Sequence, residues 1–352
     1  MSKKSKKFLT CLLVFSMVVT QVLFSSVAFA STRYSGEDRY QTALDIVKNG
    51  WSKSDTAIIA RGDDEGLADA LSAAPLAYAK GQAPILLTEP AKLYDGVLDE
   101  LKALDVKTVY IVGGPGAVST SVENELKVQF GTGNVKRLYG DDRVATSVAI
   151  AKELPSFTEA VLANAYSYAD ALSVSSIAAH RGAPILLTDK DTVTDDVLSL
   201  LNGKTVYAIG GYGVISDKVV EQTNAERIDG IDRFETNASV LEKFTPDYSK
   251  VYLANGADEN AADSLAGSAL AAKTNSPIVL VEEGSVKKAE SVLKAGLKED
   301  SEVYILGGEG VLAKSAADAV EALRPVTPAE LKVESVTALN LRQIAVKFNK
   351  TV

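Results

Sequence analysis

The sequence has 352 residues, with 46 acidic against 37 basic side chains and a formal net charge of −9. Such an excess of carboxylates disfavours non-specific binding to nucleic acid and to anionic surfaces. One histidine and one cysteine leave too little material for a histidine-based triad or a common zinc site, so we expect no metal and no cofactor.

The first 30 residues have the pattern of a secretory signal peptide. Lysines at positions 3, 4, 6 and 7 precede an apolar run from 8 to 24, and Ala28-Phe29-Ala30 is a small-residue cleavage signal. A retained membrane anchor is the alternative, which the cleavage signal disfavours, as does the lack of a later apolar run of about 20 residues. Cleavage removes four lysines, the cysteine and both methionines, and the charge becomes 33 − 46 = −13. We therefore expect an exported protein without disulfides and without membrane contact after cleavage.

One sequence motif, Arg-x-x-Gly-x-Asp-Arg-x-x-Thr, occurs three times in the remaining chain. Its copies hold six of the ten arginines, namely Arg33, Arg39, Arg137, Arg143, Arg227 and Arg233. A repeated motif of this length indicates three versions of one structural unit.

Short apolar runs alternate with helical patterns after the first copy. The runs lie at 57–60, 83–88, 108–112 and 135–138, and the helical patterns lie at 66–80, at 91–104 and from 119 onward. Buried strands that alternate with helices predict right-handed βαβ crossovers and a parallel sheet.

The same order of features returns twice. Asp69-Ala70-Leu71-Ser72 matches residues 170–173 and, loosely, 263–266, and Gly113-Gly114-x-Gly116 matches turns at 210–213 and 307–310. The sequence therefore predicts an α/β protein of three tandem modules with parallel sheets, at 31–136, 137–226 and 227–324.

Residues 325–352 differ in character from the repeats. Arg324-Pro325-Val326-Thr327-Pro328 is typical of a stiff linker, and the alternation of apolar and polar residues from 331 predicts one or two strands. Two strands alone cannot bury a sheet face. We interpret the segment as an incomplete β-sandwich domain whose remainder would follow residue 352.

Several candidate chemical features have a structural alternative. A Gly-Gly-x-Gly turn can cradle phosphate, but it also suits a tight strand-to-helix turn. Asp38, Asp142 and Asp232 either cap the helices that follow them or contact ligand. Carboxylates such as Asp69 and Asp170 could act on sugars as acid and base. His180 is most simply an ordinary helix residue.

The repeated arginines have two interpretations that can coexist. An arginine can lock a turn against an aspartate or a carbonyl, or it can present its planar fork to a phosphate or carboxylate of a ligand. Thr88 and Thr188 end buried apolar runs, where ligands of open parallel sheets are usually bound.

The tripled motifs closely resemble the type 2 cell-wall-binding repeat family of clostridia and related Gram-positive bacteria, over about residues 32 to 324. The resemblance implies three Rossmann- or toprim-like modules around a pseudo-threefold axis, packed on one another as a pseudo-trimer within the chain. It also implies non-covalent attachment of surface or S-layer-associated proteins to an anionic cell-wall glycopolymer. Its ligand residues fall on Arg39, Arg143 and Arg233, with Arg33, Arg137 and Arg227 beside them, and on Ile85, Leu86, Leu87, Ile185, Leu186, Leu187, Ile278, Val279 and Leu280. Thr88 and Thr188 join the candidate ligand residues through their place at the ends of the apolar runs.

The third repeat departs from the family pattern at Val279 and Val281, and the tail after Pro328 is similar to the first strands of Ig-like domains. We expect a secreted, non-enzymatic anchor at the cell surface, because three weak sites on one body gain avidity for a repeating polymer. The alternatives are an exported carbohydrate-active enzyme that uses Asp69 or Asp170, and a purely structural S-layer component.

Overall fold

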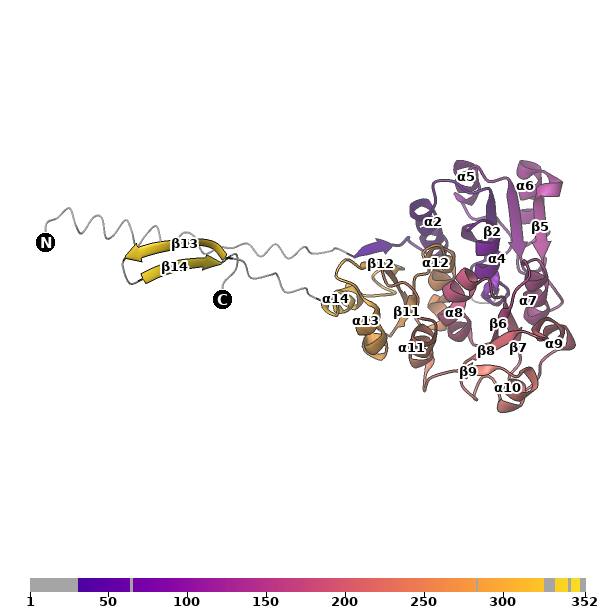
Figure 1. Cartoon of the computed structure of the whole chain (residues 1–352). Helices are drawn as coiled ribbons and strands as arrows, with labels where there is room; N and C mark the ends of the chain where they lie inside the picture. The colour runs from indigo at the N-terminus through magenta and orange to yellow at the C-terminus, as the bar shows by residue number, and fades with distance from the viewer. Residues whose placement is uncertain (1–30, 64–65, 283, 326–332, 341–342, 349–352) are drawn as a thin grey trace. The chain divides into compact units, whose positions relative to one another are not determined.

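The computed structural model describes residues 31–63, 66–282, 284–325, 333–340 and 343–348, so the predicted signal peptide and most of the linker lie outside the described residues. Three sheets of four parallel strands alternate with helices (Figure 1). In the first sheet the order is β3 (Ile85–Thr88), β2 (Thr56–Arg61), β4 (Thr108–Val112), β5 (Val135–Leu138). In the second it is β7 (Ile185–Thr188), β6 (Glu159–Asn164), β8 (Thr205–Ile209), β9 (Glu226–Ile228). These sheets confirm the predicted α/β class.

The third sheet has the same order but takes its last strand from the start of the chain. It consists of β11 (Ile278–Val281), β10 (Lys250–Asn255), β12 (Glu302–Leu306) and β1 (Thr32–Tyr34). The β1 strand runs parallel to β12, with Arg33 opposite Ile305. Stacked tyrosine rings join the strands, at 5.5 Å between Tyr34 and Tyr304 and 5.0 Å between Tyr252 and Tyr304.

Each sheet is therefore completed by the strand that opens a motif copy. The β5 strand belongs to motif copy 2 but lies in sheet 1, β9 belongs to copy 3 but lies in sheet 2, and β1 belongs to copy 1 but lies in sheet 3. We call the sheets and their helices modules 1, 2 and 3. The repeat boundaries predicted at 136/137 and 226/227 stay a prediction. They do not coincide with the ends of the sheets, because β5 completes sheet 1 and β9 completes sheet 2.

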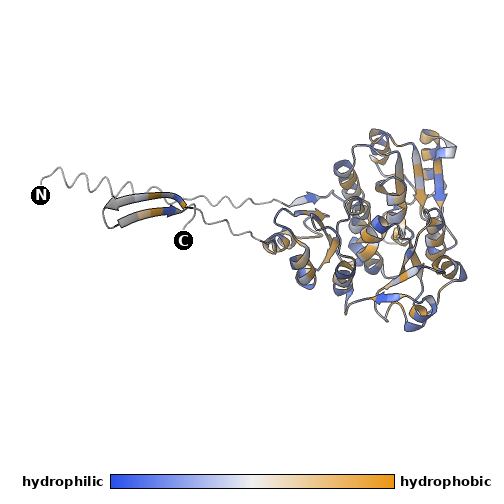
Figure 2. Ribbon diagram, viewed as in Figure 1, coloured by the Kyte–Doolittle hydropathy of each residue, from blue (hydrophilic) through white to orange (hydrophobic). Residues whose placement is uncertain are grey.

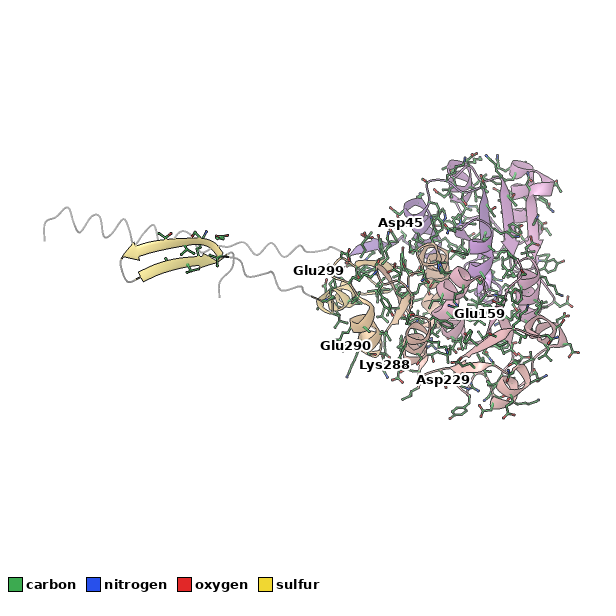
Figure 3. All side chains as sticks on the ribbon, viewed as in Figure 1. Asp45, Glu159, Asp229, Lys288, Glu290 and Glu299 are labelled. Atoms are coloured by element: carbon green, nitrogen blue, oxygen red, sulfur yellow. The ribbon has the colours of Figure 1, made fainter. Side chains whose placement is uncertain are left out.

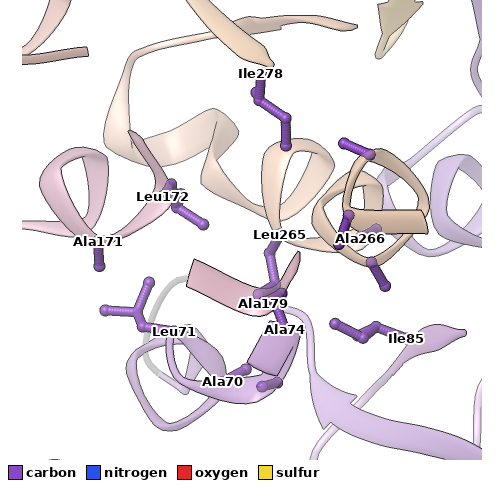
Figure 4. Close-up of a cluster of buried hydrophobic side chains, with 14 of the residues drawn as sticks. Ala70, Leu71, Ala74, Ile85, Ala171, Leu172, Ala179, Leu265, Ala266 and Ile278 are labelled. Atoms are coloured by element: carbon purple, nitrogen blue, oxygen red, sulfur yellow. The ribbon is translucent and has the colours of Figure 1, made fainter. Parts of the chain in front are cut away.

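Helices built from small side chains form the contact between the modules. They are α4 (Ala73–Ala79) in module 1, α8 (Tyr168–Arg181) in module 2 and α12 (Ala261–Lys273) in module 3, and each contacts the other two. Figure 4 shows Ala74, Ala179 and Ala266 within this contact. Such side chains let helices approach closely, and serines add polar bonds: the Ser72 Oγ donates to the Ile185 carbonyl oxygen at 2.7 Å, and the Ser176 Oγ to the Ser276 oxygen at 3.1 Å.

The helix predicted at 66–80 is in fact two pieces, α3 (Leu67–Ala70) and α4. Proline has no N–H to donate inside a helix, and it is tolerated in a first turn. Pro75 is the third residue of α4, so the helix restarts ahead of it. Ser176 and Ala269 occupy the corresponding places in α8 and α12, which run without a break.

The other helices cover the sheets, and hydrophobic residues are concentrated in the strands and in the helices between modules (Figure 2). These helices are α2 (Arg39–Gly50), α5 (Val97–Ala103), α6 (Thr120–Phe130), α7 (Arg143–Lys152), α9 (Asp195–Leu201), α10 (Asp217–Thr223), α11 (Arg233–Phe244), α13 (Glu290–Gly296) and α14 (Lys314–Ala322), with 3-10 turns η1 (Thr132–Asn134), η2 (Asp258–Asn260) and η3 (Lys287–Ala289). In the described part of the chain, no helix combines the length and the apolar character needed to span a bilayer.

The C-terminal segment contains two strands, β13 (Val333–Asn340) and β14 (Gln343–Phe348), paired antiparallel. The strands predicted from the alternating pattern are thus confirmed. Their membership of a β-sandwich or Ig-like domain stays a prediction.

The closure by β1 generates a stability prediction. Tyr34 is 8% exposed, so Tyr34→Ala removes a buried ring and is expected to cost about 3–4 kcal/mol of unfolding free energy. Urea denaturation measures the loss, and hydrogen exchange should rise first in β10 and β12. Tyr212→Ala is the matched control, since its ring is 76% exposed and its loss should change stability by less than about 0.5 kcal/mol. Equal stability of the two variants would contradict the closure.

Candidate functional site

The three motif copies form the same turn. The Asp38 Oδ1 accepts from the backbone N–H groups of Tyr40 and Gln41 at 2.9 and 2.8 Å. Asp232 caps α11 with two such bonds, and Asp142 caps α7 with one. The capping interpretation of these aspartates is thereby confirmed. The motif threonine closes the turn, since the Thr42 Oγ1 accepts from the Gly36 N–H at 3.1 Å.

Glycine is required in this turn by space. A Cβ on Gly36 would lie 2.2 Å from the Gln41 Cβ, and one on Gly140 would lie 2.3 Å from the Ala145 Cβ. Real Cβ atoms are not found at such distances, so the helix start and the turn can meet only at glycine.

The first arginine of each copy acts as a lock. Arg33, Arg137 and Arg227 each donate through Nη1 to the carbonyl oxygen of the first turn glycine in the sheet they complete, at 2.7, 2.7 and 2.8 Å. The Arg137 side chain is 7% exposed and also forms a salt bridge with Glu123 at 2.8 Å. These three guanidinium groups therefore have structural partners, and we assign the predicted ligand contacts of Arg33, Arg137 and Arg227 to strand docking.

The apolar segments predicted to bind polymer lie in the core. Ile85, Leu86 and Leu87 have no exposed surface, and their counterparts in β7 and β11, at Ile185, Leu186, Leu187, Ile278, Val279 and Leu280, are buried too. Thr88 and Thr188 are equally buried, and each donates to a loop carbonyl, of Lys92 at 2.9 Å and of Thr192 at 2.7 Å. Because these side chains present no surface to a polymer, we assign them to the core and to loop closure.

The second arginine of each copy is only half-buried and lies where a central strand ends. Through Nη1, Arg39 donates to the Gly62 oxygen at 3.0 Å, Arg143 to the Ala165 oxygen at 3.0 Å and Arg233 to the Gly256 oxygen at 2.7 Å. Arg39 also donates to the Glu259 oxygen of module 3 at 3.2 Å. Arg233 forms a salt bridge with Asp258 at 2.7 Å.

An aspartate from the preceding module faces each of these arginines, and two of the three, Asp170 and Asp263, are buried. The charge of Arg143 acts on Asp69, that of Arg233 on Asp170 and that of Arg39 on Asp263. We name these three places the 1–2, 2–3 and 3–1 junctions after the modules that they join. The site is therefore composite: each junction combines the motif turn of one repeat with the aspartate and the glycine turn of the repeat before it.

Open cavities lie at two of these junctions. A cavity of about 1100 Å³ at the 2–3 junction is lined by Asp170, Tyr212, Asp229, Ile231 and Arg233; Asp229 is labelled in Figure 3. A second cavity, of about 450 Å³ at the 3–1 junction, is lined by Glu37, Arg39, Thr42, Asp263 and Gly308.

Burial sets the protonation of the junction aspartates. Desolvation raises the pKa of Asp170 to about 6 and that of Asp263 to about 6, although the facing arginines oppose the rise. Burial also raises the pKa of Asp69, against the opposing Thr146 hydroxyl and Arg143 charge. These carboxyls pack under glycines with positive φ, and a Cβ on Gly307 would lie 2.5 Å from the Asp263 Oδ2.

The structure places His180 at the contact between helices of different modules. The His180 Nδ1 lies 3.1 Å from the Ala272 oxygen, and its ring meets Tyr78 edge-on, so it belongs to the contact between helices. Among the described residues, no cluster of three or more His, Cys, Asp or Glu side chains is placed to hold a metal ion.

The different roles of the first and the second arginine of a motif copy can be tested with Arg137 and Arg143. Arg137→Met leaves the Gly113 carbonyl without its charged donor and removes one of the two ion pairs of Glu123, so it should cost about 2–3 kcal/mol. Arg143→Met removes a half-exposed group and should cost less than about 1 kcal/mol. Urea denaturation of both variants measures the difference. A stable Arg137→Met protein would overturn the lock.

Comparison with known proteins agrees with this architecture. The family model described as Cell wall binding domain 2 (CWB2) matches residues 33–123, 137–220 and 227–317. Cwp8 from Clostridium difficile matches with a TM-score of 0.76 and 31% identity, over 83% of this chain and 51% of that one. Cwp6 from the same organism matches with a TM-score of 0.74 and 29% identity, over 90% and 54%.

Curated relatives include proteins that are longer than the matched region. The chain is 35% identical to N-acetylmuramoyl-L-alanine amidase LytC of Bacillus subtilis over 84% of its own length and 60% of that protein. It is also 35% identical to the amidase enhancer of the same organism, over 73% and 35%. With three matched segments and three modules of the same design, the chain belongs to the Cell wall binding domain 2 family.

Proposed function

We propose that this chain attaches an exported protein to the Gram-positive cell wall by binding an anionic secondary wall polymer at its three junctions. The supporting observation is that Arg39, Arg143 and Arg233 recur at equivalent, half-exposed positions, while the chain as a whole is acidic. An acidic body repels a polyanion everywhere except at such foci, so binding rests on local cations.

The arginine is the anion-binding group in this proposal, and the helix terminus has a supporting role. The N-terminus of a helix attracts anions through its unpaired N–H groups and its dipole. At α2 and α11, however, the capping aspartates Asp38 and Asp232 already accept two of these N–H groups each. The guanidinium, which lies next to the cap, has the planar fork that pairs bidentately with phosphate or carboxylate.

Three weak sites on one body are useful against a repeating ligand. When one junction binds, the other two meet the same polymer at a high effective concentration, and avidity rises without any new contact. The contacts among α4, α8 and α12 support a fixed spacing of the sites. We therefore propose that the modules act together as one pseudo-trimeric body on the cell surface.

Wall attachment is also what we propose this chain shares with the amidase relatives. The chain spans 60% of LytC and 35% of the amidase enhancer, and the family model that it matches describes a binding domain. Any hydrolytic activity is accordingly assigned to parts of such proteins outside the repeats, and this chain is proposed to be non-enzymatic.

One observation favours the carbohydrate-active alternative enough to test it. The pKa of Asp170 is raised to about 6 inside a cavity that other carboxylates also line, which is the kind of setting in which a glycosidase keeps its acid. Release of reducing sugar from purified wall by this chain, abolished in both Asp69→Asn and Asp170→Asn, would favour the enzyme over the anchor.

The anchor predicts a specific effect of the second arginines. Combined Arg39→Ala, Arg143→Ala and Arg233→Ala should release the protein from isolated cell walls in a sedimentation assay, with an unchanged circular dichroism spectrum. Wild-type binding should weaken as salt rises, because exposed charge pairs are screened. Arg181→Ala is the matched control, since this arginine forms a salt bridge with Glu159. Full binding by the triple variant at moderate salt would refute the proposal.

The junction aspartates predict a pH dependence. Between pH 7.5 and 5, Asp170 and Asp263 take up protons, so one negative charge near Arg233 and one near Arg39 are neutralised and polyanion binding should tighten. The pKa of Asp170 and of Asp263 in the folded protein lies above the usual 3.8, so protonation of these two carboxyls favours the folded state. Their contribution to the free energy of unfolding is fully present below pH 3.8 and is lost as pH rises through about 6.

The double variant Asp170→Asn, Asp263→Asn provides the control. It should bind walls at pH 7.5 as tightly as the wild type does at pH 5, and most of its pH dependence should disappear. A wild-type affinity that is constant from pH 7.5 to 5 would contradict the proposed role of these carboxyls.

A further inference from the structure

The three most exposed tyrosines of the described chain all lie at the junctions. Tyr139, Tyr166 and Tyr212 are 50%, 66% and 76% exposed. A large aromatic ring left in water forgoes the stabilisation that burial would give it, and tyrosine is enriched at surfaces that bind partners. All three lie at the edge that carries the second arginines, and a ligand that binds at this edge would explain why the rings are exposed.

At the 1–2 junction one tyrosine lies against Arg143 and another lies against the glycine turn of module 1. The guanidinium carbon of Arg143 lies 4.5 Å from the centre of the Tyr166 ring. The Tyr166 N–H donates to the Asn164 Oδ1 at 2.8 Å, which fixes the backbone below the ring. Tyr139 lies over the glycine turn of module 1, where a Cβ on Gly114 would come within 3.2 Å of its ring. Both rings are thus held in place and keep exposed surface.

The 2–3 junction has different apolar groups around the larger cavity. Tyr212 occupies the variable position of the Gly-Gly-x-Gly turn, and Ile231, next to the capping Asp232, is 92% exposed. Both line the cavity that contains Arg233. This junction therefore also places exposed apolar surface beside an arginine.

The 3–1 junction has no such ring at the corresponding places. Glu309 stands where Tyr212 stands, and Glu37 stands where Ile231 stands. Ser35 stands where Tyr139 stands, and Asp63, which follows the Gly62 bound by Arg39, stands where Tyr166 follows the Ala165 bound by Arg143. No atoms lie within 4 Å of a Cβ on Gly308 or on Gly310, so the turn itself has room for a larger side chain. The three junctions share a backbone and an arginine but differ in the chemistry that surrounds them.

We propose that the 1–2 and 2–3 junctions bind pyranose rings of the polymer by stacking them on Tyr139, Tyr166 and Tyr212, and that the 3–1 junction, which lacks such rings, does not stack sugars. The inference rests on the proposed polymer binding and adds its sugar-recognising residues. The axial C–H face of a pyranose is apolar and matches an aromatic face, and tyrosine loses little side-chain entropy when it binds. The neighbouring arginine then pairs with an anionic group of the same polymer.

The test compares two probes on the full chain. The probes are polysaccharide released from purified Gram-positive cell walls, which has sugar rings, and inorganic polyphosphate, which has charge alone. The triple variant Tyr139→Ala, Tyr166→Ala, Tyr212→Ala should bind the polysaccharide at least about tenfold more weakly in calorimetric titration. The same variant should bind polyphosphate as the wild type does, and a triple Tyr→Phe variant should retain polysaccharide binding because it keeps the rings.

The outcomes separate this inference from the proposed function. If the wild type binds neither probe, polymer binding itself is refuted, and the inference with it. If the wild type binds polysaccharide and the triple alanine variant binds it equally well, stacking alone is refuted. Equal weakening for both probes also refutes stacking, because the tyrosines would then only support the arginines.

A gain-of-function variant tests the third junction. Glu309→Tyr places a ring between Gly308 and Gly310, where Tyr212 lies in the 2–3 junction, and removes a negative charge. It should strengthen polysaccharide binding several-fold, and more than Glu309→Gln, which removes the charge without adding a ring. Equal effects of the two substitutions would overturn the proposed difference between the junctions.

Discussion

The exchange of edge strands is the constraint on which the rest of this structure depends. Strands β5, β9 and β1 each carry an arginine that bonds to the first glycine after the neighbouring strand, and each is followed at once by the motif turn. Because the strand is fixed in one module and the helix that follows belongs to the next, the turn must lie at the junction. The position of the candidate site is thus a direct result of how the sheets are completed.

Electrostatics at the junctions follow from the same arrangement. An arginine from one repeat meets an aspartate that another repeat has buried, so each charge is balanced across a module boundary. Burial disfavours the ionised form of these carboxyls, so in mildly acidic surroundings each junction loses a negative charge. An arrangement of this kind places a positive charge and a carboxyl from different modules next to each other at every junction.

Much of this fold could be predicted from the sequence. The period of the apolar runs and the tripled motif indicate three parallel α/β modules, and the capping role of Asp38 follows from its place before a helix. The break between α3 and α4 also had a visible signal in Pro75. The pairing of β1 with β12 had no signal in the sequence, because a linear repeat pattern contains no information about which sheet accepts the first strand.

The candidate site was less accessible to sequence reasoning. The two arginines of each copy look alike in sequence, and their burial and their bonding partners separate the lock at Arg137 from the half-buried group at Arg143. The Ile-Leu-Leu segments are central to the motif because they form the core. Tyr166 and Tyr212 lie at positions that vary among the three repeats, so no recurring pattern marked them.

The circular order of strand donation also bears on how such a protein can change over evolutionary time. An open solenoid grows by adding units at its ends, because each unit contacts only its neighbours. Here the first and last units are joined through β1 and β12, so an extra unit would have to be inserted into a closed ring and would disturb the contact among α4, α8 and α12. Copy number is therefore held at three, and diversification must proceed by divergence of the individual units.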